Sequence, residues 1–140
     1  MKNKKISFSK PKNLGRRLWG EEILLNYIPN LLTLKLLKIK KNKKGGLQFH
    51  RKKNECGYIL SGKLKVKYVK KGKLVSKILK KGDSFHFPPG VVHQEIALTN
   101  CNIIEASSPH LNDRVRVEKK FGIDFEKGLP TTLLKDIKKL

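Results

Sequence analysis

The chain of 140 residues contains few cysteines, few aromatic residues and no long apolar run. Its two cysteines, Cys56 and Cys101, are too few for a disulfide framework, so we expect a reducing, cytoplasmic location. The apolar stretch at 28–39 is interrupted by Lys35 and Lys38, which leaves no segment of the ~18–20 apolar residues that a membrane span needs. No apolar run follows the N-terminal lysines as it would in a secretory signal. The length suits one domain with a single core.

Acidic residues are also scarce. The chain has 11 Asp and Glu and 33 Lys and Arg, which gives a formal net charge of +22. Such a charge attracts nucleic acids and anionic membranes in a salt-dependent way. The lysines alternate with apolar residues at 63–81, a pattern that places them on the outer face of strands. They lack the interleaved series of aromatic residues on which bases stack. We therefore expect no membrane partner and no specific nucleic-acid partner, with non-specific polyanion binding as a by-product.

Short alternating segments separated by turns predict an all-β protein. We expect roughly eight to ten strands with turns every ~8–12 residues, which is typical of a sandwich or barrel. Residues 1–16 read as a basic N-terminal arm or edge strand, and 17–126 as the β-barrel domain. The tail at 127–140 contains TTLLKDIKKL, whose apolar spacing predicts a short C-terminal helix.

Two segments far apart in the chain carry side chains that can ligate a metal, bounded by glycines and prolines. They read Gln48-x-His50-x4-Glu55-x6-Gly62 and Gly82-x5-Pro88-x-Gly90-x2-His93. Residues two apart on a strand share a face, so Gln48 and His50 point the same way, whereas parity alone does not place Glu55. Imidazole and carboxylate suit a divalent transition metal such as Mn, Fe, Co, Ni or Zn.

Together these segments resemble the two signature motifs of the cupin superfamily. The resemblance implies a single cupin-type double-stranded β-helix, or jelly-roll barrel, with one metal inside. It implies that four side chains converge on that metal: Gln48, His50, Glu55 and His93. Gln48 stands where the common pattern has a histidine, which leaves two imidazoles, one carboxylate and an amide as the ligand set.

Three further segments narrow the resemblance, namely RRLWGEE at 16–22, LQFHRKKNE at 47–55 and DRVRVEKKFG at 113–122. They look like parts of the type II mannose-6-phosphate isomerases, which are sugar-phosphate cupins. That resemblance implies a metal-dependent isomerase or epimerase acting on a sugar phosphate or nucleotide sugar through an enediol. The chain departs from the family pattern at Ile123 and Gln94, where arginines are frequent.

The isomerase hypothesis needs a proton-transferring base and groups that hold an anionic carbohydrate. The candidate bases are Glu95 and His86, and the candidate substrate-binding residues are Arg116, Lys52 and Tyr58. Arg116 is the preferred phosphate anchor, by its match to the Val-Arg of the family's closing segment. For His86, either of the alternating faces of its strand could enter the barrel.

Two other functions remain open at this point. One is a non-catalytic cupin that binds a sugar or metabolite, which the missing arginines favour. The other is an Fe(II)-type oxygenase or lyase, because two histidines and one carboxylate can hold iron with open positions. The resemblance further implies a homodimer, in which edge strands pair across a two-fold axis.

Overall fold

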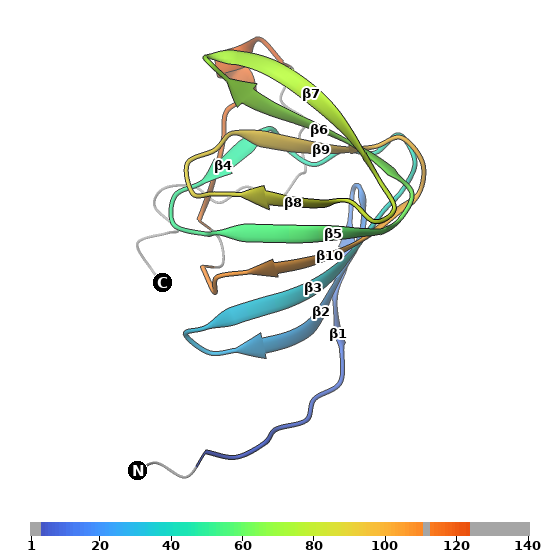
Figure 1. Ribbon diagram of the computed structural model, residues 1–140, viewed down its shortest axis with the longest axis vertical. Coiled ribbons are helices and arrows are strands. Elements are labelled where there is room, and N and C mark those ends of the chain that lie inside the picture. The colour runs from blue at the N-terminus through green and yellow to red at the C-terminus, as the bar shows by residue number, and fades with distance from the viewer. Residues whose placement is uncertain (1–3, 111–112, 124–140) are drawn as a thin grey trace.

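The computed structural model describes residues 4–110 and 113–123, which form two antiparallel sheets facing each other (Figure 1). The strands are β1 (Lys12–Arg17), β2 (Gly20–Ile28), β3 (Leu32–Ile39), β4 (Gln48–His50), β5 (Glu55–Ser61), β6 (Lys63–Lys70), β7 (Lys73–Lys80), β8 (Ser84–Phe87), β9 (His93–Ala97), β10 (Cys101–Ser107) and β11 (Arg114–Arg116). A short 3-10 helix, η1 (Glu118–Phe121), follows β11. The expected all-β, cupin-type jelly roll is confirmed.

The strand order shows how segments far apart in the chain become neighbours. One sheet has six strands in the order β1-β2-β3-β10-β5-β8, and the other has five in the order β11-β4-β9-β6-β7. The first metal-competent segment therefore divides between the sheets, with β4 in one and β5 in the other. The second segment also divides between the sheets, because β8 pairs with β5 in one sheet and β9 pairs with β4 in the other. Both segments meet at one end of the space between the sheets.

The inward faces of the long strands are apolar at one end and polar at the other. On β10, Ile103 lies opposite Leu37 of β3 and Ile59 of β5, and all three are buried in the hydrophobic core. Two residues further along β10, Glu105 lies opposite Lys35 of β3, and both are buried as well. Apolar burial at the first end stabilises the barrel, while the second end forms a polar cavity.

The first segment ends at a turn that only glycine fits. Gly62 has φ +92°, and a Cβ placed there would lie 2.2 Å from the carbonyl oxygen of Asn100. This turn joins β5 to β6 and so carries the chain from one sheet to the other. The glycine of the motif is therefore explained by backbone geometry.

The expected domain boundaries can be compared with the structure near the two ends of the chain. Strand β1 pairs with β2 at the edge of the six-stranded sheet, so the expected boundary after residue 16 falls inside a strand. The expected helical tail at 127–140 lies outside the described residues. Within the described part of the chain, no helix has the length and apolar character needed to span a membrane.

Candidate metal centre

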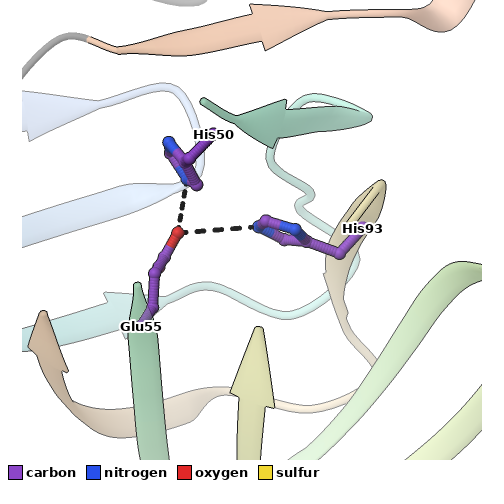
Figure 2. Close-up of side chains that lie close together, drawn as sticks. All are labelled: His50, Glu55 and His93. Atoms are coloured by element: carbon purple, nitrogen blue, oxygen red, sulfur yellow. Dashed lines mark ion pairs between the residues drawn. The ribbon is translucent and has the colours of Figure 1, made fainter. Parts of the chain in front are cut away.

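Three buried side chains from three strands meet in the polar half of the barrel. His50 ends β4, Glu55 begins β5 and His93 begins β9, so each projects from the end of a strand. Their ligand atoms all lie within 4.8 Å of one another. Figure 2 shows both imidazoles pointing at the Glu55 carboxylate, where Oε1 forms an ion pair with Nε2 of His50 and lies 3.8 Å from Nε2 of His93.

The second nitrogen of each imidazole is held by a neighbouring oxygen. Nδ1 of His93 lies 3.0 Å from the carbonyl oxygen of Val91, and Nδ1 of His50 lies 3.2 Å from Oδ1 of Asp113. Because a carbonyl oxygen only accepts, Nδ1 of His93 carries the proton and its Nε2 keeps a lone pair. The ring of Phe87 stacks on His93 with 4.1 Å between centroids and fixes its plane. This is how proteins orient histidine ligands toward a metal.

The electrostatics of Glu55 fit a bound cation. Although burial alone would raise its pKa, the hydrogen bond from His50 and the charges of Lys53 and both histidines lower it, so the carboxylate is ionised. Its Oε1 is fully buried and faces the two imidazole nitrogens, and among the described residues it has no other hydrogen-bond donor. A buried, ionised and underpaired oxygen between two imidazole nitrogens suits a divalent transition metal. The fourth predicted ligand, Gln48, lies beside His93 in the β4–β9 pairing and lines the same cavity.

The cavity around this centre has a volume of about 310 Å³ and carboxyl groups with shifted acidity. Glu95, predicted as a base, lines the cavity, and burial together with the Glu55 charge raises its pKa to about 8. Glu105 was missed from the sequence. Its pKa is raised well above the ordinary value, first by burial and then by the charge of Glu55. The alternation of Ile103, Glu105 and Ser107 on β10 was the available signal.

Three predicted residues lie away from the centre, which corrects their expected roles. Phe87 faces inward, so His86 faces outward, is exposed and has Nε2 2.7 Å from Oδ1 of Asn54. Tyr58 is 45% exposed and lies with His86 on the outer side of the sheet. Lys52 is exposed as well. The cause for Tyr58 is parity, because Glu55 is directed inward and a residue three positions along the same strand points outward.

Lys53 and Arg116 line the cavity instead. Nζ of Lys53 lies 3.9 Å from Oε2 of Glu55 and 3.6 Å from Oε1 of Glu105. Burial opposes the charge of Lys53, but the surrounding acidic groups, Glu55 among them, outweigh it and raise its pKa. Arg116 is paired with the buried carboxylate of Glu118, and its side chain is only 2% exposed. The predicted phosphate anchor therefore already has an internal partner of opposite charge.

Comparison with known protein families agrees with the fold described above. Residues 35–105, about half of the chain, match the Cupin domain family. The chain belongs to the cupin family. No curated protein matches it at a significant level.

Several solved cupin-like structures resemble this cupin. The capsular polysaccharide assembling protein CapF from Staphylococcus aureus superposes with a TM-score of 0.67 at 16% identity, covering 79% of this chain and 32% of that one. An RmlC-like cupin from Shewanella frigidimarina gives 0.59 at 24% identity, covering 79% and 96%. KdgF from Halomonas sp. gives 0.54 at 22% identity, covering 64% and 77%. This cupin thus spans about a third of CapF, and at these identities the likeness shows the fold alone.

The arrangement in this cupin can support two kinds of chemistry. Two imidazoles and one carboxylate leave coordination positions open for oxygen atoms of a ligand. The nearby carboxyl of Glu95, with its pKa near neutrality, can give or take a proton. The site could therefore bind an oxygen-rich small molecule, and it has a group able to move a proton on it.

Proposed function

We propose that this cupin is a metal-dependent isomerase or epimerase that acts on a sugar phosphate or nucleotide sugar, similar to the type II mannose-6-phosphate isomerases. The observation that carries the proposal is the buried His50–Glu55–His93 cluster opening into a cavity that also contains Glu95. The Trp-Gly, Gln-x-His and Val-Arg segments of the sequence support this substrate class.

The residues of the cavity can divide the reaction between them. His50, Glu55 and His93, with Gln48 beside them, would hold a divalent metal, which supplies Lewis-acid stabilisation of a developing oxyanion. Glu95 takes the proton from the carbon next to the substrate carbonyl and returns it to the former carbonyl carbon. The hydroxyl proton passes from one of the two neighbouring oxygens to the other, so no net proton is consumed. Burial and the Glu55 charge raise the pKa of Glu95 to about 8 in the metal-free protein, which makes it a stronger base than an exposed carboxylate.

The structural neighbours agree with a carbohydrate substrate without identifying it. CapF is named as a capsular polysaccharide assembling protein, but this cupin corresponds to only a third of its length. Nearly all of the RmlC-like cupin, 96% of it, superposes on 79% of this chain. We propose that this cupin likewise acts on a carbohydrate, and that it is a cytoplasmic homodimer.

The test combines metal content with turnover. We expect about one transition metal per chain by plasma mass spectrometry, and its loss in a His50→Ala/His93→Ala double variant. Conversion of mannose 6-phosphate to fructose 6-phosphate, or of related sugar phosphates, is then followed in a coupled assay with each metal. A wild type that stays empty after incubation with Mn, Fe, Co, Ni and Zn would refute the metalloenzyme.

One observation favours a second candidate. The two-histidine, one-carboxylate set is also the ligand set of Fe(II) oxygenases and some lyases. Oxygen consumption by the iron-loaded protein with candidate metabolites would identify that activity. A metal-loaded protein that binds sugars but shows neither turnover nor oxygen consumption would be a non-catalytic binding cupin.

A further inference from the structure

The outer face of the six-stranded sheet is apolar in a chain that is otherwise rich in lysine. On this face, Ile104 of β10 lies between Leu36 of β3 and Tyr58 of β5. Leu36 in turn lies opposite Ile23 of β2. Directly opposed residues project from the same face of a sheet, and the adjacent Ile103 is buried in the core. The row from Ile23 to Tyr58 therefore points away from the barrel.

A second row runs two residues further along β10, where Ala106 lies between Leu34 and Cys56. The two rows cross the neighbouring strands β2, β3, β10 and β5 (Figure 1). Together they form one surface, the outer apolar patch, made of Ile23, Leu34, Leu36, Cys56, Tyr58, Ile104 and Ala106. Tyr58 is 45% exposed, and Leu60 beside it is 37% exposed. Connected apolar side chains that remain accessible mark an interaction surface, whereas single ones do not.

The lysines of the exterior lie on the other sheet. On β6, Lys63, Lys65 and Lys67 alternate with the buried Leu64 and Val66, so they point outward from the five-stranded sheet. None of the members of the outer apolar patch is charged. The two outer faces of the barrel therefore differ in character, one bearing lysines and the other apolar.

This distribution of charge favours a second copy of the chain as the partner. A formal net charge of +22 makes copies repel one another wherever their lysine-bearing faces meet. Two copies placed patch to patch bring their least charged surfaces together and direct the lysines of β6 to opposite sides. An acidic partner would be attracted to the lysine-bearing face instead. The row that borders the patch carries both signs of charge, as in the polar rim of an interface, and contains Arg16, Glu21 and Lys38.

The size and shape of the patch fit an interface between identical surfaces. With strands ~4.8 Å apart and a rise of ~3.4 Å per residue, the five strands from β2 to β8 and the seven residues of β10 span roughly 570 Å². Two such faces would bury about 1,100 Å², which exceeds the ~1,000 Å² expected of a specific interface. Tyr58 stands beside a hollow whose lining includes the small side chains of Cys56, Ser84 and Ala106. A two-fold axis would place the tyrosine of each copy against the hollow of the other.

We propose that the outer apolar patch is the surface through which two copies of this chain form a homodimer, packed sheet against sheet around a two-fold axis. This interface rests on the homodimer of the proposed function and gives it a location. Packing of sheet faces takes the place of the edge-strand pairing expected from the sequence. Tyr58, expected from the sequence to contact the substrate, becomes a residue of the interface.

Sedimentation velocity of the full chain over a wide range of protein concentrations tests this interface. We expect a dimer whose dissociation constant falls as salt is added, because salt screens the repulsion between two cationic copies. Ile104→Lys places two like charges between the apposed patches and should raise the dissociation constant on the order of 30-fold or more. Tyr58→Lys changes a residue that is already 45% exposed, so it keeps the test informative if Ile104→Lys fails to fold.

Ile78 offers a matched control, because it is an apolar residue of β7 that is 58% exposed and lies opposite Lys65. Ile78→Lys adds the same charge to the lysine-bearing face and should leave the dissociation constant unchanged. Circular dichroism and a thermal melt establish which variants are folded. A wild type that is monomeric at every concentration would overturn the interface. Dimers that persist in the folded patch variants, or equal weakening by Ile78→Lys, would also overturn it.

The two cysteines report on the patch without any substitution there. Cys56 belongs to the patch and is exposed, whereas Cys101 is buried, so a thiol reagent should modify Cys56 first. We expect the rate of this modification to fall as protein concentration rises and the dimer forms. An unchanged rate in a dimeric sample would place the interface elsewhere and overturn the proposal. Protection of Cys56 in a monomeric sample would show that the same chain covers the patch, and would overturn it as well.

Failure of the interface and failure of the proposed function give different results. A dimer that is weakened by Ile104→Lys and Tyr58→Lys, without turnover of any sugar phosphate, would retain the interface and remove the isomerase. Turnover by a monomeric wild type, or by a dimer in which Cys56 stays reactive, would retain the isomerase and remove the interface.

Discussion

Asp113 links the metal centre to the loop that follows β4, and its replacement by asparagine is the sharpest test of the site. Oδ1 of Asp113 lies 3.2 Å from Nδ1 of His50, while Oδ2 accepts hydrogen bonds from the backbone N–H groups of Lys52 at 2.7 Å and Lys53 at 2.8 Å. The carboxylate is buried, with the residue only 4% exposed. It therefore orients a proposed ligand and holds the turn between two ligands.

Asp113→Asn keeps the shape but changes the donor pattern. If the amide oxygen continues to accept from the two backbone N–H groups, its NH2 group is turned toward Nδ1 of His50. An NH2 group only donates, so Nδ1 must accept and the proton moves to Nε2, where the metal should bind. Loss of such a partner weakens metal binding by roughly 10- to 100-fold, which corresponds to about 1.4 to 3 kcal/mol.

Competition with a chromogenic chelator measures this affinity for Co or Zn at neutral pH. Asp83→Asn is the matched control, because Asp83 accepts a backbone N–H from Lys80 in an exposed turn and is remote from the ligands. A thermal melt of both variants separates a lost ligand orientation from unfolding. Equal metal affinities in a folded Asp113→Asn and in Asp83→Asn would refute the assignment of His50 as an oriented ligand.

Three further results are expected. Glu95→Gln should flatten the pH dependence of stability in the metal-free protein. Because its pKa is raised to about 8, folded Glu95 retains a proton that the unfolded chain releases above about pH 4.5, so the stability of the wild type falls as pH rises through this window, by about 5 kcal/mol at most. Identical urea midpoints of the two proteins across this pH range would contradict the expectation. Gly46→Ala should destabilise by about 1–3 kcal/mol because the new Cβ would lie 2.8 Å from Nε of Arg116, whereas Gly45→Ala meets nothing within 4 Å and should be close to neutral in the same denaturation assay. His86→Ala should leave metal content unchanged, since the imidazole faces outward, and loss of metal would show that its placement is wrong.

Much of the fold and the centre of the candidate site could be predicted from the sequence. Alternation and turn spacing are local properties, so they indicate an all-β chain before any contact is known. The two motif segments also contain His50, Glu55 and His93, which were among the predicted ligands, and the structure brings these three together. Their turn residues were informative for a physical reason, as the steric fit of Gly62 shows.

The limits of that prediction appear where a choice of face or partner was needed. Alternation in the strand of His86 allowed either face to enter the barrel, and only the pairing of Phe87 with Glu55 directs Phe87 inward and His86 outward. Tyr58 could have been excluded by its odd separation from Glu55, once that side chain was known to face inward.

The sequence by itself determined the alternation and the turns, because these depend on neighbours a few residues apart. Its resemblance to the cupin motifs implied four ligands, Gln48, His50, Glu55 and His93, of which the structure brings the last three together. Only the tertiary structure decided which charges share the cavity. Lys35, Glu105 and Arg114 lie on three strands that become neighbours of the site only through sheet pairing. The raised pKa of Glu105 and the lowered pKa of Arg114 depend on burial, which no local pattern encodes.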